Sequence, residues 1–210
     1  PEMKQYTSGE MMRTRNFYLL LATMFFGLIS YFMVSPVSQT YQIDLGIASA
    51  VAVSAVMLGS IVNAGARLVL PTLADKVGRI VCIKGVLIVA VIAMGVLAVS
   101  RSLAVTVAVV LMYGCYGGIM GSFPSLTSSI FGMKHTGENY GFVMFGIVFA
   151  TFGAPAISGL VSSNGYEMNV VFGIGAVFAV IAFVCLTLLG RNLVKERAEK
   201  SVSTKIGTAL

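Results

Sequence analysis

The sequence predicts an all-α integral membrane protein, and two observations carry that prediction. First, 57% of the 210 residues are hydrophobic and only 10% are charged, whereas a soluble domain carries about 25% charged residues. Second, six stretches have the roughly 20 apolar residues that a helix needs to cross a bilayer. These stretches are 17–37, 47–70, 80–100, 103–124, 139–161 and 168–190. Strands of a membrane barrel are about ten residues long and alternate in polarity, so helices are favoured.

The distribution of charge predicts how the helices are oriented. Six spans place both termini on one side of the membrane, and of the 14 Lys and Arg residues only Arg101 falls on the other side. Because cytoplasmic loops carry an excess of Lys and Arg, we expect both termini in the cytoplasm and the chain in the plasma (inner) membrane. The net charge of +6 then faces anionic lipid and requires no nucleic-acid partner.

A charged turn after the second span is the sharpest local motif. Residues 63–79 read NAGARLVLPTLADKVGR, with Asp75, Gly78 and Arg79 in D-x-x-G-R spacing and Lys76 between them. We expect an inner loop over 71–79, in which glycine permits an unusual backbone angle and the acid pairs with a base or caps the next helix. A generic basic turn is the alternative.

This segment resembles the loop signature of the major facilitator superfamily, whose pattern runs roughly G-x-L-x-D-x-x-G-R. Leu73, Asp75, Gly78 and Arg79 match that pattern, and Pro71 stands where the first glycine is expected. The resemblance implies a six-helix bundle of two inverted three-helix repeats, which is half of a facilitator fold. It also implies transport by alternating access, with Asp75, Lys76, Gly78 and Arg79 stabilising one end state.

The position of the motif bears on which half the chain represents. The signature follows the second of six spans, a basic leader precedes the first span, and a tail without a further span follows the last, which favours the C-terminal half. We therefore divide the chain into a cytoplasmic leader or inter-half linker (1–16), a transmembrane domain (17–190) and a cytoplasmic tail (191–210) that frays after 200. The expected partners are the missing N-terminal six-helix half or a second copy of the chain, and the lipid bilayer.

Three stretches are similar to the oxalate/formate antiporters and the related monocarboxylate porters: 8–18, 63–79, and 123–132 followed by 139–141. This resemblance implies a secondary transporter of small organic anions. The oxalate transporters of that group carry a lysine in the span that corresponds to 139–161, and no Lys or Arg is present there. A single cation suits a monocarboxylate better than a dianion. The alternatives are transport of a different small solute and a non-transporting sensor or structural protein on the same fold.

Arg67 is the candidate for the anion-binding residue. An arginine inside a span is costly and normally faces the bundle interior, and its planar fork binds a carboxylate with two hydrogen bonds. The porters that this chain resembles use an arginine in the corresponding span to bind the substrate carboxylate. The alternatives are that Arg67 extends to the membrane interface or pairs with Asp75. Four further polar residues within spans complete the candidate substrate site: Tyr31, Asn63, Tyr113 and Tyr116. The alternative for each is ordinary packing or a place in an interfacial aromatic belt.

The remaining chemistry-bearing residues do not indicate an enzyme. His135 is the only histidine and is expected in an inner loop, and the three cysteines, which are expected to be buried apolar residues, are Cys82, Cys115 and Cys185. We expect no catalytic residues, no metal and no cofactor. The small residues of 114–121, with glycines four apart, predict a close helix–helix contact, with a flexible gate as the alternative.

Overall fold

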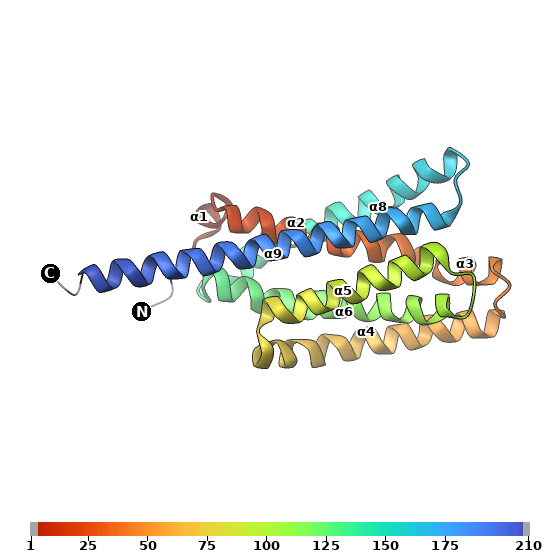
Figure 1. The fold of residues 1–210 in the computed structure, drawn as a ribbon, viewed down its shortest axis with the longest axis horizontal. Coiled ribbons are helices and arrows are strands. Elements are labelled where there is room, and N and C mark those ends of the chain that lie inside the picture. Colours follow the sequence, from red (N-terminus) through yellow and green to blue (C-terminus); the bar gives the residue numbers. More distant parts are fainter. Residues whose placement is uncertain (1–3, 208–210) are drawn as a thin grey trace.

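The computed structural model describes residues 4–207, and all regular secondary structure in that range is helical. Six helices or continuous helical segments have the length and hydropathy needed to cross a membrane, which confirms the predicted fold class. The helices run roughly along the long axis of the molecule, and both ends of the chain lie at the same end (Figure 1). We call this the basic end. The helices are α1 (Ser8–Met12), α2 (Arg15–Val34), the 3₁₀ turn η1 (Ser35–Val37), α3 (Ser38–Asp44), α4 (Ser49–Val77), α5 (Arg79–Val99), α6 (Ala104–Phe131), α7 (Thr136–Val143), α8 (Phe145–Ser163) and α9 (Met168–Gly207).

Several helices continue beyond the predicted spans. The expected inner loop over 71–79 is wrong, because α4 runs through Pro71 to Val77 and only Gly78 separates it from α5. The predicted tail is helical as well, since α9 extends to Gly207 instead of fraying after 200. Residues 208–210 lie outside the described part of the chain. Helices are favoured over loops here because α4 and α9 already supply hydrogen-bonded turns that the following residues can extend.

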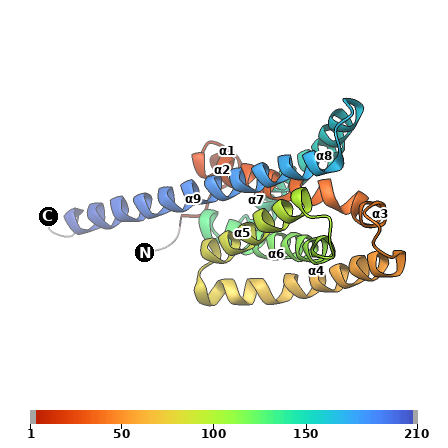
Figure 2. The ribbon, with the colours of Figure 1, turned by 45° about the vertical axis from the view of Figure 1, so that its right-hand side comes forward.

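The helix contacts follow the symmetry of two three-helix repeats. Helices α2, α4 and α5 form the first repeat, and α6, α8 and α9 form the second. The contact of α4 with α6 corresponds to that of α8 with α2, and the contact of α5 with α6 corresponds to that of α9 with α2. Helices α4 and α8 lie along opposite edges of the bundle in both ribbon views (Figures 1 and 2). The described fold is therefore the predicted six-helix arrangement of two related repeats.

Burial distinguishes the central helices from the edge helices. In the most apolar window of each span, 61% of the residues around α2 are buried but only 11% in α4 and 22% in α7–α8. The buried core lies mainly among α2, α5, α6 and α9. One long side of α4 is thus left without a partner among the described residues.

Glycines bring α4 and α6 into backbone contact. A Cβ added to Gly121 would lie 2.8 Å from the Arg67 carbonyl oxygen, and one added to Gly117 would overlap the carbonyl group of Asn63. One turn earlier the glycine is on α4: a Cβ added to Gly59 would lie 2.9 Å from Cγ of the Tyr113 ring. The two helices are parallel and repeat this contact every four residues, which confirms the close approach predicted from the glycine cluster.

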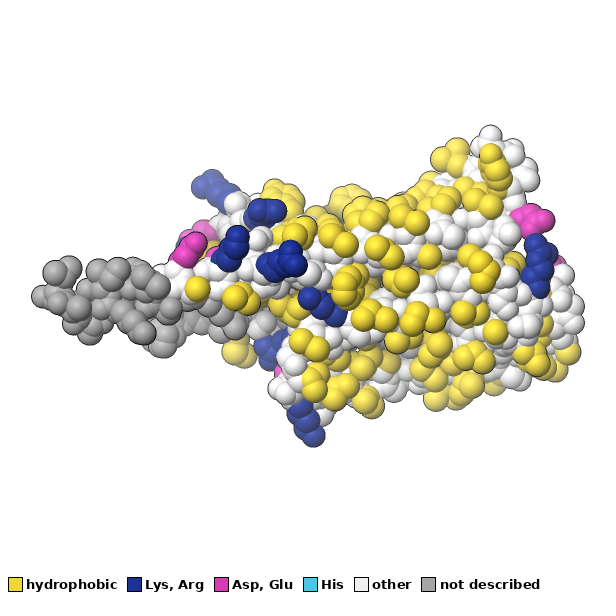
Figure 3. Space-filling model, viewed as in Figure 1, with side chains coloured by type: hydrophobic (Ala, Val, Ile, Leu, Met, Phe, Trp, Pro, Cys, Tyr) yellow, Lys and Arg dark blue, Asp and Glu magenta, His cyan; other side chains and the backbone are white. Residues whose placement is uncertain are grey.

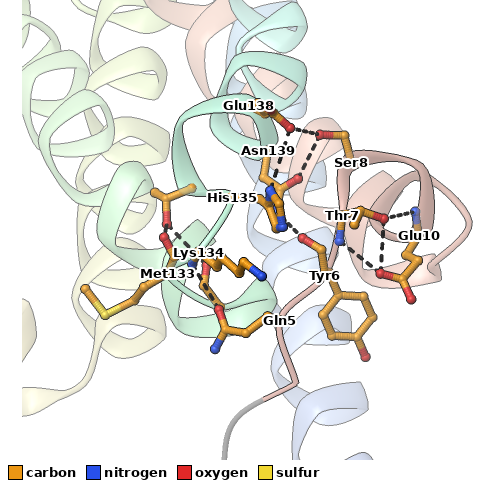
Figure 4. Close-up of polar contacts among 12 residues, drawn as sticks. Gln5, Tyr6, Thr7, Ser8, Glu10, Met133, Lys134, His135, Glu138 and Asn139 are labelled. Carbon is orange, nitrogen blue, oxygen red and sulfur yellow. Dashed lines mark hydrogen bonds and ion pairs between the residues drawn. The ribbon is translucent and has the colours of Figure 1, made fainter.

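The leader is docked against the loop between α6 and α7 (Figure 4). The Tyr6 amide donates to the Phe131 carbonyl at 2.9 Å, and the fully buried Asn139 donates its side-chain amide to the Tyr6 carbonyl at 3.0 Å. The amide of Lys134 donates to Gln5 Oε1 at 2.9 Å. The Ser8 hydroxyl also donates to Asn139 Oδ1 at 3.2 Å, which joins parts of two of the three stretches on which the antiporter resemblance rests.

The turn into α1 is fixed by a capping box. The Thr7 amide donates to Glu10 Oε2 at 3.0 Å, and Thr7 Oγ1 in turn accepts the Glu10 amide. The hydrogen bonds that the Glu10 carboxylate accepts from the amide and hydroxyl of Thr7, with a smaller contribution from Lys4, hold the pKa of Glu10 below its usual range. The leader therefore has a defined structure of its own at the basic end.

We predict that Gly117→Ala lowers the free energy of unfolding by about 1–3 kcal/mol, because its methyl group overlaps the α4 backbone. Gly95→Ala is the matched control, since a Cβ there meets nothing within 4 Å and alanine favours the helix. The measurement is thermal or denaturant unfolding in detergent. Equal stabilities of the two variants would contradict the described α4–α6 contact.

Candidate functional site

Arg67 lies further from the end of its helix than the predicted span 47–70 placed it. It comes ten residues before the end of the helix at Val77, which is roughly 15 Å along the axis. Its Nε donates to Oδ1 of Asn63 at 3.0 Å, one turn earlier on the same face. Its guanidinium carbon lies 5.4 Å from the centroid of the Tyr116 ring, within cation–π distance. The side chain is thus held from two sides.

The tyrosines of the candidate site form one aromatic cluster with this arginine. The rings of Tyr31 and Tyr116 are stacked, with centroids 4.3 Å apart and 15° between the planes. The rings of Tyr113 and Tyr31 form a T-shaped pair, with centroids 5.3 Å apart and 84° between the planes. Helices α2, α4 and α6 therefore bring together all five residues that the sequence singled out one by one.

Several further polar residues border this cluster. Ser35 Oγ lies 3.2 Å from the Tyr31 hydroxyl and 3.5 Å from that of Tyr113, which Ser38 Oγ also approaches at 3.4 Å. Ser38 was not singled out from the sequence, and its place two residues after Pro36, at the end of a span, was the available signal. The site thus extends to the η1 turn.

The charge of Arg67 is not neutralised by an acid in the described part of the chain. Asp75, the expected alternative partner, instead pairs with Arg79 at 3.1 Å. Because Asn63 occupies Nε, the two terminal nitrogens of the guanidinium remain available to a ligand. Such a fork binds a planar carboxylate with two parallel hydrogen bonds.

The D-x-x-G-R motif forms a tight turn at the basic end. Gly78 adopts φ +100°, the positive angle that its lack of a Cβ permits, and Asp75 and Arg79 pair across the turn. The ion pair is confirmed, whereas neither side chain caps α5. Lys76 is exposed. These residues lie at the helix ends, well away from the tyrosine cluster, so the motif and the aromatic site are separate features.

Comparisons with known proteins agree with this architecture. The family model of the Major Facilitator Superfamily matches residues 4–152. The chain is 27% identical over 189 residues to the "Oxalate:formate antiporter" of Oxalobacter formigenes, covering 89% of this chain and 45% of that protein. It is 32% identical over 146 residues to the "Uncharacterized MFS-type transporter YhjX" of Escherichia coli (strain K12), covering 68% of this chain and 36% of that protein. The chain thus spans less than half the length of these relatives.

The helical architecture and the family match together define a multi-pass membrane protein of a transporter class. The chain belongs to the major facilitator superfamily. This confirms the resemblance that the D-x-x-G-R motif indicated. The similarity to an oxalate:formate antiporter agrees with the resemblance to the oxalate/formate antiporter group.

We predict that the Gly78 backbone contributes more to stability than the ion pair across it. Gly78→Ala should cost about 1–3 kcal/mol, because alanine is strained at this φ. Asp75→Asn should cost less than about 1 kcal/mol, because the Asp75 side chain is 61% exposed and exposed pairs contribute little. Thermal unfolding of both variants, with Gly137→Ala as the glycine control, tests this order. A larger loss for Asp75→Asn would contradict it.

Proposed function

We propose that this chain forms the anion-binding half of a secondary transporter for small organic anions, with monocarboxylates as the preferred class. The observation that carries the proposal is Arg67: its guanidinium is held by Asn63 and Tyr116, has no acidic partner among the described residues, and keeps its two terminal nitrogens free. A carboxylate would supply the missing counter-charge. The stacked rings of Tyr31 and Tyr116 and the hydroxyl of Tyr113 would line the rest of the site.

The proposed preference for a monocarboxylate follows from charge. Helices α7 and α8 contain no Lys or Arg, so one arginine faces the proposed substrate from this half. A dianion would leave one negative charge without a partner in a region of low dielectric constant, which is costly. The oxalate:formate antiporter among the relatives supports the general class, since both solutes in its name are carboxylates.

The proposed mechanism is alternating access, for which the chain needs a second six-helix unit. The unburied side of α4, which carries Arg67, and the weakly buried α8 are the surfaces that such a unit would cover. The unit is either the other half of a longer protein or a second copy of this chain. Substrate would then bind between the two units near the middle of the membrane, and the turn at Gly78 would stabilise one end state.

We expect Arg67→Gln to abolish most exchange, since loss of charged hydrogen bonds worth about 1.5–3 kcal/mol weakens binding roughly ten- to hundredfold. The assay is exchange of labelled formate, lactate and oxalate by proteoliposomes that contain the longest natural chain with these residues. Arg67→Lys keeps the charge but loses the fork, so an intermediate affinity is expected. Arg15→Gln, an exposed arginine of the basic end, is the matched control.

Two outcomes of this assay would count against the proposal. Normal exchange by folded Arg67→Gln would remove Arg67 from the substrate site while leaving the transporter class intact. Absence of exchange for all three anions by the folded wild-type protein would exclude the carboxylate class and favour a different solute or a non-transporting role.

We also propose that the basic end faces the cytoplasm of the cell. Arg101 would then lie on the outer surface, where it pairs with Glu167 at 2.8 Å, and Lys134 would lie inside. With the native cysteines replaced, Arg101→Cys should react with an impermeant maleimide in intact cells, whereas Lys134→Cys should react only after the membrane is opened. The reverse pattern would overturn the orientation.

A further inference from the structure

Lys84 is a cation inside a membrane-spanning helix without an acidic partner. It is the sixth residue of α5, which begins at Arg79, so its Cα lies about 7–8 Å into the helix. Its side chain is half-buried, and no described carboxylate lies within ion-pair distance of its ammonium group. The ammonium nitrogen instead lies 5.7 Å from the centroid of the Phe183 ring of α9. A charge at this depth requires a counter-ion or contact with the headgroup region.

The neighbouring helix α9 places a second cation beside its line of contact with α5, which we call the α5–α9 groove. Helices α5 and α9 are in contact and run in opposite directions, and a Cβ added to Gly190 would touch Ile80 at 3.5 Å. Arg191 follows Gly190 directly and is exposed. Lys84 and Phe183 thus meet deeper in the groove, and Arg191 lies near its opening at the basic end.

The surroundings of this groove are those of a lipid-facing surface. Four large apolar side chains flank it and are exposed: Val81 and Ile88 on α5, and Val180 and Val184 on α9. Figure 3 shows this face, with Lys and Arg side chains gathered toward the basic end and an apolar surface beyond them. The groove therefore offers positive charge at the basic end. Further along the helices it offers apolar side chains that acyl chains can contact.

We propose that the groove between α5 and α9 binds the headgroup phosphate of an anionic phospholipid. The Lys84 ammonium contacts the phosphate from the deeper side and the Arg191 guanidinium from the open side. The lipid chains lie along the exposed valines and isoleucine. Basic pockets between membrane helices near a headgroup layer bind anionic lipids in this way. The site is separate from Arg67 and does not depend on which solute the protein transports.

A single fluorophore can report on this groove. The 210 residues contain no tryptophan, and Phe183→Trp keeps an aromatic ring beneath Lys84. In nanodiscs of phosphatidylcholine, spin-labelled phosphatidylglycerol should quench this tryptophan more strongly than spin-labelled phosphatidylcholine does at the same mole fraction. The signal is taken as the difference from the parent protein. Adding Lys84→Gln should weaken the association with phosphatidylglycerol about fivefold, the effect of losing one cation near a membrane surface.

Matched variants separate a specific site from the general charge of the basic end. Lys134→Gln removes the same charge at the same end, in the α6–α7 loop, and should leave the quenching unchanged, while Lys84→Arg should retain most of it. Equal losses for Lys84→Gln and Lys134→Gln in folded proteins, or no preference for phosphatidylglycerol in the Phe183→Trp protein without a further substitution, would overturn the proposal. Relief of quenching by millimolar inorganic phosphate would assign the groove to a free anion and would also overturn it. Melting curves in phosphatidylcholine alone verify that each variant is folded.

Discussion

The backbone contact between α4 and α6 is the constraint on which the rest of the site depends. At Gly117 and Gly121 the two helices are too close for any side chain on α6, and small residues permit such an approach where lipid gives no hydrophobic driving force. The contact fixes the register of Asn63 and Arg67 against α6, and so places the guanidinium beside Tyr116. A shift of one turn would separate the arginine from the aromatic cluster.

The charge of Arg67 is positioned without being neutralised. An acid at ion-pair distance would hold the side chain more firmly, but it would also compete with any anionic ligand. An amide oxygen and a ring face orient the guanidinium and leave its charge available. In contrast, Arg79 and Arg101 are paired with Asp75 and Glu167 at the two ends of the bundle. Arg79 and Arg101 thus have acidic partners, whereas Arg67, beside the tyrosine cluster, has none among the described residues.

Helix burial explains why the cluster lies where it does. The central helices α2 and α6 supply the tyrosines, of which Tyr31 and Tyr113 are buried. The edge helix α4 supplies the cation from a side that the described residues leave uncovered. The related position of α8 on the opposite edge follows from the correspondence between the two three-helix repeats.

The sequence by itself determined the fold class, the number of spans and the family, because hydropathy over about 20 residues and the spacing of Asp75, Gly78 and Arg79 are local properties. It also selected Arg67 and the tyrosines individually. Only the tertiary structure decided that Tyr31, Tyr113, Tyr116, Asn63 and Arg67 form one cluster, that Asp75 pairs with Arg79 and not with Arg67, and that Lys84 lies over Phe183. These contacts join residues up to about a hundred positions apart, and they depend on helix register, which the packing of glycines against a neighbouring backbone sets and which no local pattern encodes.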